Sequence, residues 1–396
     1  MQQKPESAED VAGAASGKFA WTLDVYMKRK DLENAHCSME PPAEVGSFSL
    51  TASKDDPYEH RREFHNDRSC MSQLYRRGPY SVVQGLSMPL DKGYNTFIRR
   101  KDARDLSQRE HVTHMLNWIS HHPQEFLAFR PEIVCWRGHL DSIMSSPFEA
   151  TELSPGWIIC ACKMDGVIYL TNFDTVKKTQ HKQHPIKNQE RFEYWGYKFE
   201  QYMTHNPKVR GSYDEPVNNF NGFIAVLKRK IGGTRVLFGA ETDCMDPLQK
   251  DTPAPGCYGE LKTTRLLYTD YHKSKFYNHK MCKVWAQCSI AGIPTVIVGY
   301  RDDAGVCVST EEFQTGRIPT IAQKYGARWS TLVCNNFLDT FLKLVKEYVK
   351  EDCQRAVYKF EWDPLDKWKI TVEKWHPQSK WTFLPDWYVE QRPNGG

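Results

Sequence analysis

The stretch Thr-Arg-Val-Leu-Phe-Gly-Ala-Glu-Thr-Asp, residues 234–243, begins with mostly apolar residues and ends with two acids. This pattern indicates a β-strand, in which every second side chain points to the same face. Glu241 and Asp243 therefore share one face, at the end where the strand leaves the core. Either the two acids enter a cleft, or they are exposed charges on a solvated strand end.

The stretch Tyr-Gly-Glu-Leu-Lys-Thr, residues 258–263, also reads as a strand. Its Glu260 and Lys262 share one face, and Leu261 points to the other. On an exposed sheet edge this would be an ordinary charge pair. If the two acidic strands are neighbours, however, three carboxylates and one amine converge.

Clustered carboxylates predict a divalent metal site. Oxygen ligands suit Mg²⁺ or Mn²⁺ rather than zinc or copper, because hard cations prefer oxygen. A lysine beside them can orient a nucleophilic water or stabilise the charge of a phosphoryl transition state. The spacing of Asp243, Glu260 and Lys262, D-x(16)-E-x-K, resembles the acidic core of the PD-(D/E)xK metal-dependent nucleases.

Two further polar residues lie on expected helices. Glu200 falls in a helix expected at 189–205, on the same face as Gly196 and next to an apolar stripe. It is either a third acidic ligand or a solvated glutamate. Gln287 lies in an aromatic-rich helix and could hydrogen-bond a substrate or the sheet below.

The tripeptide Trp136-Arg137-Gly138 follows an apolar strand. Arginine suits bidentate phosphate contact, and glycine lets a backbone approach a ligand. A structural ion pair would explain Arg137 equally well. Glu110 has a local explanation, because Ser107-Gln108-Arg109-Glu110 matches a capping box at the start of a helix.

The composition is that of a globular protein with many aromatic residues. The chain has 396 residues, a formal net charge of +4 and an aromatic fraction of 13%. This mild charge permits a nucleic-acid partner without indicating one. The twelve cysteines include no C-x-x-C and no zinc-finger spacing, which favours reduced thiols in a soluble intracellular protein. No apolar stretch is long enough to span a membrane.

The order of the segments predicts a single α+β domain over residues 21–396, with a central mixed sheet and a disordered tail at 1–20. An exposed basic loop is expected at 175–190, and helices are expected after residue 110, ending at Pro123, and at 189–205, 275–291 and 335–350. The helix at 189–205 should bury a stripe of Phe192, Trp195, Phe199 and Met203. Strands are expected at 133–137, 157–163, 167–172, 220–228, 234–243, 258–263, 294–300 and 306–310.

Taken in order, these motifs resemble the DXO/Rai family of RNA 5′-end nucleases, also called the decapping exoribonuclease family. The resemblance covers the chain from about residue 40 to its end. It rests on a collinear set of segments: Glu44-Val-Gly-Ser-Phe-Ser-Leu50, Trp136-Arg-Gly-His-Leu140, Gly196-Tyr-Lys-Phe-Glu-Gln-Tyr-Met203, Glu241-x-Asp243-Cys244, Tyr258-x-Glu-Leu-Lys-Thr263, Trp285-Ala-Gln287 and Phe383-Leu-Pro-x-Trp-Tyr-Val-Glu390.

The resemblance implies a larger mixed sheet and a smaller sheet surrounded by helices, with a deep active-site pocket between them. It implies two divalent cations, Mg²⁺ or Mn²⁺, with metal ligands at Glu200, Glu241, Asp243, Glu260 and the backbone carbonyl of Leu261. Lys262 and Gln287 fall on positions that contact the scissile phosphate or the water. Further substrate-contacting positions are Lys54, Glu110, Trp136, Arg137, Gly138 and Ile224. Lys54 departs from the family pattern, because it stands where an arginine contacts substrate; lysine keeps the charge but loses the bidentate fork.

The resemblance also implies an activity. The expected substrates are RNA 5′ ends that carry a triphosphate, an incompletely methylated cap or an NAD cap, followed by 5′→3′ exonuclease action on the monophosphate product. Every acidic ligand is present, which argues against the catalytically inactive branch of the family. The family further implies a monomer that can act with a protein exoribonuclease partner, without a membrane, in the nucleus or alternatively the cytoplasm.

Two alternatives stay open at this point. The first is a non-catalytic protein that binds RNA ends or activates a partner exonuclease. The second is a PD-(D/E)xK nuclease that acts on DNA.

Overall fold

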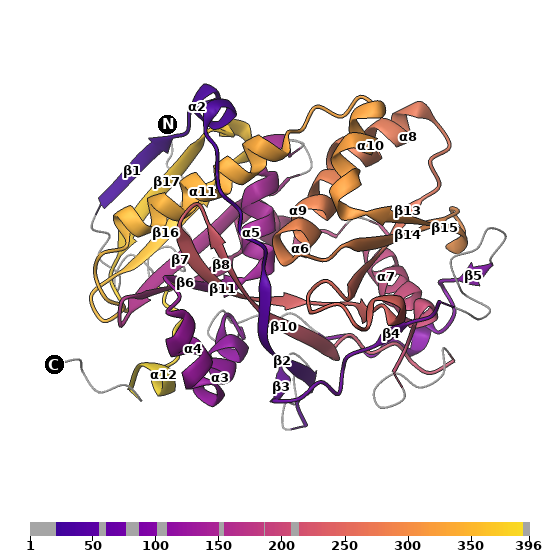
Figure 1. Ribbon diagram of the computed structural model, residues 1–396, viewed down its shortest axis with the longest axis horizontal. Helices are drawn as coiled ribbons and strands as arrows, with labels where there is room; N and C mark the ends of the chain where they lie inside the picture. Colours follow the sequence, from indigo (N-terminus) through magenta and orange to yellow (C-terminus); the bar gives the residue numbers. More distant parts are fainter. Residues whose placement is uncertain are drawn as a thin grey trace, which may run out of the picture.

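The computed structural model describes residues 21–54, 61–76, 87–100, 109–149, 154–185, 187–206 and 214–390. The expected tail at 1–20 and the Ser107-Gln108 half of the expected capping box lie outside these ranges. Two β-sheets with helices packed on them make up the described part, as Figure 1 shows. This α+β architecture, with one larger and one smaller mixed sheet, is the one expected.

The larger sheet contains ten of the described strands, in the order β1-β17-β16-β7-β8-β6-β11-β10-β2-β3. Their bounds are β1 (Trp21–Tyr26), β2 (Ala43–Ala52), β3 (Arg62–His65), β6 (Ile133–Trp136), β7 (Trp157–Met164), β8 (Val167–Phe173), β10 (Gly222–Ile231), β11 (Thr234–Glu241), β16 (Val357–Trp362) and β17 (Lys369–Trp375). The smaller sheet contains seven described strands, in the order β5-β15-β14-β13-β12-β4-β9. Their bounds are β4 (Gln73–Leu74), β5 (Met88–Pro89), β9 (Thr204–His205), β12 (Cys244–Met245), β13 (Tyr258–Arg265), β14 (Thr295–Arg301) and β15 (Val306–Gln314).

The described helices cover these sheets. Their bounds are α2 (Arg29–Asn34), α3 (Thr113–His121), α4 (Pro123–Phe129), α5 (Arg137–Ser145), α6 (Val176–Gln183), α7 (Gln189–Met203), α8 (Asp270–Lys275), α9 (Met281–Ala291), α10 (Ile318–Lys324), α11 (Thr331–Tyr348) and α12 (Asp386–Glu390). A π-helical turn, Phe276–Lys280, joins α8 to α9, so the long helix expected at 275–291 is interrupted.

Three strands in the middle of the larger sheet, β8, β6 and β11, run parallel. Their carboxyl ends therefore lie along one edge of the sheet, which we call the carboxyl edge. Phe173, Trp136 and Glu241 are the last residues of these strands. The carboxyl edge of parallel strands is a common location for ligand sites.

The two acidic stretches lie in different sheets. β11 ends at Glu241, and Thr242 and Asp243 carry the chain across to β12 in the smaller sheet. Glu260 lies in β13 of that smaller sheet, which pairs with β12 in antiparallel register. The two acidic strands are therefore not direct neighbours, and a two-residue crossing rather than strand pairing brings their acids together.

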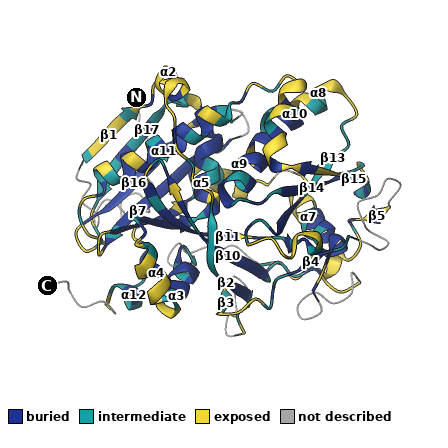
Figure 2. Cartoon of the chain, viewed as in Figure 1, coloured by how far each residue is buried: buried dark blue, intermediate teal, exposed yellow. Residues whose placement is uncertain are grey.

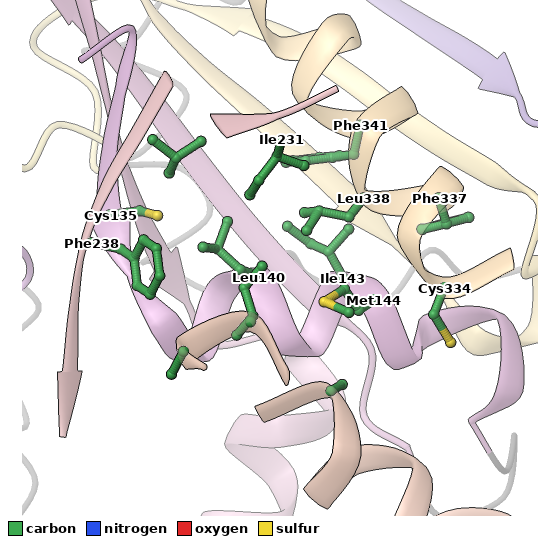
Figure 3. Close-up of a cluster of buried hydrophobic side chains, with 14 of the residues drawn as sticks. Cys135, Leu140, Ile143, Met144, Ile231, Phe238, Cys334, Phe337, Leu338 and Phe341 are labelled. Atoms are coloured by element: carbon green, nitrogen blue, oxygen red, sulfur yellow. The ribbon is translucent and has the colours of Figure 1, made fainter. Parts of the chain in front are cut away.

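Buried side chains form layers on both faces of the larger sheet. Figure 2 shows the central strands in the dark blue of buried residues, with yellow exposed residues on the outer faces of the helices. In Figure 3, side chains of α5 and α11 meet near two strands of the larger sheet. The labelled residues, all in one buried cluster, are Cys135, Leu140, Ile143, Met144, Ile231, Phe238, Cys334, Phe337, Leu338 and Phe341.

Two local expectations are corrected by the structure. The basic stretch at 175–190 contains the helix α6, whose start is capped by the Thr175 side chain accepting from the Lys178 amide. No residue of α6 is buried, so the stretch had no apolar periodicity from which a helix could be predicted. In α7, Trp195, Phe199 and Met203 are buried as expected, but Phe192 is 43% exposed.

The expected helix after residue 110 begins at Thr113 rather than at the capping-box position. Its N-cap, Val112, makes no side-chain capping bond. Pro123, expected to end this helix, instead begins the next one, α4. A proline fits the first turn of a helix because its missing N–H has no partner there anyway.

All twelve cysteines carry free thiols, and eleven of them are buried, as expected for reduced cysteines. None of the described helices combines the length and apolar character that a membrane-spanning helix needs.

We expect Gly239→Val to destabilise the fold by about 1–3 kcal/mol, the usual cost of overpacking a core. Gly239 lies in β11 opposite Trp136, and a Cβ at this position would lie 2.7 Å from the Trp136 ring and 2.8 Å from the Met115 sulfur. The matched control is Gly196→Ala in α7, where an added Cβ meets no atom within 4 Å. This control should gain up to about 1 kcal/mol, because alanine is the better helix former. Urea unfolding checks both values, and equal midpoints for wild type and Gly239→Val would contradict the close packing.

Candidate active site

Asp243 connects the two sheets by a hydrogen bond to backbone. Its Oδ2 accepts from the Leu261 amide at 2.7 Å, although Asp243 follows the larger sheet and Leu261 lies in the smaller one. Thr242, between Glu241 and Asp243, donates its amide to the Phe223 carbonyl at 3.0 Å. Both residues of the crossing are therefore fixed by backbone groups, and the Asp243 carboxylate lies beside β13.

Glu260 is the most enclosed carboxylate of the set, at 1% exposure. Its Oε1 accepts from the Lys262 ammonium and, at 2.7 Å, from the Gln287 side-chain amide. Its Oε2 lies 3.3 Å from Arg137 Nη1. A buried carboxylate needs such partners, because an unpaired charge in the interior is costly. Lys262, Gln287 and Arg137 were all candidate residues, and the structure gathers them on Glu260.

The remaining acids line one cleft. Glu200 on α7, Glu241 at the end of β11 and Asp243 share a cavity of about 50 Å³ between the two sheets, with Tyr197 and Phe223 also in its wall. This volume accommodates ions and a few waters rather than a whole nucleotide. All four predicted acidic ligands thus lie at this junction, three on the cleft and Glu260 just behind Asp243.

The accumulated negative charge changes the acidity of these groups. Burial and the charges of Glu260 and Glu200 raise the pKa of Asp243 well above its ordinary value, against the opposing effect of Lys262. Burial also opposes ionisation of Glu260, but Lys262 and Arg137 outweigh it and lower its pKa. Burial disfavours the Lys262 ammonium, yet Glu260 and Asp243 raise its pKa. The site therefore holds more carboxylate charge than its own cations neutralise.

Leu261 contributes through its backbone. The N–H and C=O of one strand residue point to the same side, and the Leu261 N–H points at Asp243. Its carbonyl oxygen therefore also faces the side of β13 on which Asp243 lies. This position is consistent with the predicted fifth oxygen ligand.

The donor set fits a divalent cation. Carboxylate and carbonyl oxygens are the ligands of Mg²⁺, Mn²⁺ and Ca²⁺, and a cation would relieve the repulsion around Asp243. Within the described ranges, however, no three Asp, Glu, His or Cys side chains are already grouped tightly enough to hold a metal ion. The cause is visible in the contacts, because Glu260 is held by Lys262, Arg137 and Gln287, and Asp243 by the Leu261 amide. Cation binding would require the carboxylates to turn toward one another.

The tripeptide Trp136-Arg137-Gly138 lies where β6 ends and α5 begins. Trp136 donates its ring N–H to the His111 carbonyl at 2.7 Å, and Arg137 is buried against Glu260. A Cβ added to Gly138 would meet no atom within 4 Å, so the surface beside it is open. Arg137 is thus an ion-pair partner of a predicted metal ligand, as the second of its two explanations expected, and its contact with a phosphate stays a prediction.

Three other predicted substrate contacts lie outside the cleft wall. Lys54 is exposed after β2. Ile224 is the register partner of Glu241, so the two side chains point to the same face of the sheet, but the Ile224 side chain is buried in the core. Glu110 accepts from Arg62 and Arg100, and lies 3.2 Å from His114. Burial opposes its ionisation, but His114 and the two arginines hold the pKa of Glu110 at about 2.

Sequence reasoning missed Arg62 and Asp141. Arg62 donates a hydrogen bond to Glu110. A Cβ added to Gly222 would lie 3.0 Å from Glu241 Oε1 and 3.9 Å from Arg62 Nη1, so Arg62 and Glu241 approach the same point beside Gly222. No motif marked Arg62, because its partners come from distant segments. Asp141 lies one helical turn after Arg137, and this spacing could have identified it as a neighbour of Arg137 on the same helix face. Burial and Glu260 raise the pKa of Asp141 to about 7, although Arg137 opposes this.

The raised pKa of Asp141 predicts a pH-dependent stability. An unfolded aspartate has a pKa of about 3.9, so between pH 4 and 7 the folded chain retains a proton that the unfolded chain loses. The free energy of unfolding therefore falls as pH rises through this window. Asp141→Asn removes that loss and should gain up to about 4 kcal/mol relative to wild type between pH 4 and 8. Urea unfolding in EDTA at several pH values measures the gain. Asp270→Asn on exposed α8 is the control. If the free energy of unfolding changes with pH in the same way for Asp141→Asn and wild type, the assignment is contradicted.

Known proteins resemble this chain over most of its length. Residues 40–389 match the model of a family described as RAI1 like PD-(D/E)XK nuclease. A curated relative, the decapping and exoribonuclease protein of Bos taurus, is 33% identical over 355 residues, covering 88% of this chain and 84% of the relative.

Solved structures share the fold. Candida albicans Rai1 in complex with pU5 and Mn²⁺ aligns with a TM-score of 0.74 at 18% identity, covering 94% of this chain and 98% of that one. Scheffersomyces stipitis Rai1 in complex with (3′-NADP)+ and calcium ion aligns with a TM-score of 0.71 at 22% identity, covering 95% of each chain. With the acidic cleft between two sheets and a family match over residues 40–389, the chain belongs to the RAI1-like PD-(D/E)XK nucleases of the DXO/Rai family.

Proposed function

We propose that this protein is a metal-dependent nuclease that removes abnormal 5′ ends from RNA. Its substrates would carry a 5′-triphosphate, an incompletely methylated cap or an NAD cap, and 5′→3′ degradation of the monophosphate RNA would follow. The observation that carries the proposal is the grouping of Asp243, Glu260 and Lys262 at the junction of the two sheets.

The names of the relatives support this substrate class. The Bos taurus protein is named for decapping and for exoribonuclease activity. The Candida albicans protein was solved with pU5 and Mn²⁺, and the Scheffersomyces stipitis protein with an NADP-like molecule and calcium. These ligands are an RNA-like 5′ end, a dinucleotide resembling an NAD cap, and divalent cations.

Glu200, Glu241, Asp243, Glu260 and the Leu261 carbonyl would hold two divalent cations, Mg²⁺ or Mn²⁺. When bound, such cations lower the pKa of a water that attacks phosphorus and neutralise the leaving oxygen.

The chain's own groups position the reacting phosphate. Glu260 accepts hydrogen bonds from the Lys262 ammonium and the Gln287 NH₂ group, and each of these groups has further N–H donors for a phosphate oxygen. Lys262 keeps its proton because it pairs with Glu260 and lies in the field of Asp243, so it presents a positive charge to the phosphoryl oxygens. Arg137 offsets the charge of Glu260 from the opposite side and keeps that carboxylate ionised.

Glu200→Gln should reduce turnover by at least about 100-fold. The amide replaces an anionic oxygen with a neutral one, and even outer contacts of a metal site cost 10–100-fold when removed. The matched control is Glu193→Gln on the same helix, because Glu193 is exposed and pairs with Arg99 outside the cleft. Release of the terminal group from unmethylated-cap RNA measures both variants. Equal rates for the two variants would place Glu200 outside the site.

Lys262→Met should reduce kcat by about 100- to 1000-fold, the usual cost of losing one electrostatic contact to a transition state. Affinity for Mn²⁺ should not weaken, because removal of a positive charge leaves the carboxylates more attractive to a cation. A calorimetric Mn²⁺ titration alongside the rate measurement separates the two effects. Lys275→Met, on α8, controls for general loss of charge. A weakened Mn²⁺ affinity with unchanged kcat would contradict the proposed role.

The choice of 5′ end requires a direct comparison. Purified protein with Mg²⁺ or Mn²⁺ is incubated with RNA bearing an unmethylated cap, NAD, triphosphate or monophosphate, and with a matched single-stranded DNA. The proposal expects metal-dependent products from RNA only, abolished by Asp243→Ala and by Glu260→Ala. Binding without product would favour a non-catalytic RNA-end binder, and equal cleavage of DNA would favour a general nuclease.

A further inference from the structure

Two cysteine thiols meet where the helices α9 and α11 begin. Cys282 lies in the first turn of α9, and Cys334 lies near the start of α11. Both are buried in the same hydrophobic cluster, and the Cys334 thiol shares a hydrogen bond with the Cys282 sulfur. Both thiols are free. Because a disulfide needs a separation of about 2.05 Å between the sulfurs, two thiols already in contact can form one with a small movement.

The starts of the two helices are held together by contacts on either side of Cys282. Trp329, two residues before α11, donates its ring N–H to the Tyr277 carbonyl at 2.9 Å. The centroid of the Trp329 ring lies 5.4 Å from that of Trp285, on the other side of Cys282 in the sequence. In Figure 3 the Cys334 sulfur points away from the Phe337 ring of the same helix. The contact between the two thiols is therefore part of a fixed junction between α9 and α11.

A cavity of about 90 Å³ gives access to Cys282. The side chain of Lys283, also in its wall, is 56% exposed, so the cavity opens at the surface beside this lysine. A single water needs about 10–15 Å³ of such space, so a small hydroperoxide fits. Cys334 is not among the described residues that line the cavity. A small oxidant can thus reach Cys282 directly, whereas Cys334 lies behind it.

The environment of Cys334 also makes it a poor first nucleophile. Burial and the hydrogen bond with Cys282 raise the pKa of Cys334 well above its ordinary value. The thiolate is the nucleophilic form of a cysteine, so Cys334 should react slowly with an oxidant from solution. Its contact with Cys282 nevertheless places its sulfur for attack on Cys282, once that residue is oxidised.

We propose that Cys282 and Cys334 form a redox modification site, at which a small hydroperoxide converts the two thiols into a disulfide. The Cys282 thiolate attacks the terminal peroxide oxygen, so that an S–O bond forms, the O–O bond breaks, and the leaving oxygen takes up the Cys282 proton. The Cys334 sulfur then attacks the Cys282 sulfur, an S–S bond forms, the S–O bond breaks, and the hydroxide leaves as water with the Cys334 proton. The two thiols give up two electrons, which reduce the peroxide, and a dithiol reductant reverses the change.

The disulfide would act on the predicted active site through α9. Gln287 lies five residues after Cys282 on this helix and donates to Glu260 at 2.7 Å. Formation of the disulfide draws Cys282 toward Cys334 and so shifts the helix that carries Gln287. A displacement of about 1 Å can cost about 100-fold in rate, so oxidation should slow RNA turnover by at least about tenfold. This effect on turnover rests on the proposed function, whereas formation of the disulfide does not.

Peroxide treatment of the reduced full-length protein tests the modification. The cysteine linkages are mapped by mass spectrometry of peptides, and dimedone traps any sulfenic acid. Cys282→Ala and Cys334→Ala each remove one of the two thiols. Cys353→Ala is the matched control, because Cys353 is free and partly exposed and lies after the end of α11.

Wild type and Cys353→Ala should form a link between Cys282 and Cys334 that dithiothreitol removes. Cys334→Ala should stop at a dimedone-labelled Cys282, whereas Cys282→Ala should leave Cys334 unlabelled. Links confined to other cysteines would overturn the proposal, and so would labelling of Cys334 in the absence of Cys282. The mapping of wild type decides the question even where a variant fails to fold.

Turnover of unmethylated-cap RNA, measured after catalase has removed the peroxide, tests the effect on the active site. Peroxide should slow wild type at least about tenfold, and dithiothreitol should restore the rate. Cys282→Ala should keep its rate after the same treatment. A mapped disulfide with an unchanged rate, or an equal loss in Cys282→Ala, would overturn the link to the active site. Inactivity of the reduced wild type would instead contradict the proposed function, and the mapping would still decide whether the disulfide forms.

Discussion

The buried charge of Glu260 is the constraint on which this site depends. Moving a carboxylate out of water costs several kcal/mol, and the cost is offset only by well-placed partners. Here the partners come from separate elements, since Lys262 lies on the same strand, Gln287 on α9 and Arg137 at the start of α5. Satisfying one charge therefore fixes the positions of two helices relative to the smaller sheet. The same contacts gather the groups that a phosphoryl transfer needs, so the interactions that allow Glu260 to be buried also build the site.

The sequence predicted the site better than it predicted the surrounding connections. Strand alternation placed Glu241 beside Asp243 and Glu260 beside Lys262, and the family resemblance added Glu200 and Gln287. Whether the two acidic strands are neighbours stayed open, because no local pattern reveals that the chain changes sheets at Thr242. Arg62 was missed because its partners are distant in sequence, and a pattern of spacing cannot report such contacts. The helix α6 was missed because it buries nothing, and the periodicity of apolar residues is the signal by which helices are found.

The parallel strands β11, β6 and β8 end along one edge of the larger sheet, because parallel strands end on the same side. Glu241, at the end of β11, lines the acidic cleft, and Arg137, directly after β6, pairs with Glu260. The neighbouring Trp136 packs its ring against the core and donates its ring N–H to the His111 carbonyl. Adjacent residues of one short motif thus hold the core together and supply a cation to the site.

The two-residue crossing at Thr242 and Asp243 limits how this protein can change during evolution. Surface loops usually accept insertions, because each doubling of a loop costs little entropy. This connection cannot be lengthened in the same way, because Thr242 bonds to backbone of the larger sheet and Asp243 to backbone of the smaller sheet. One inserted residue would carry Asp243 past the Leu261 amide and separate the acids that the two sheets contribute. Length variation among descendants of this chain should therefore accumulate in peripheral loops, while the segment between β11 and β12 keeps a fixed length.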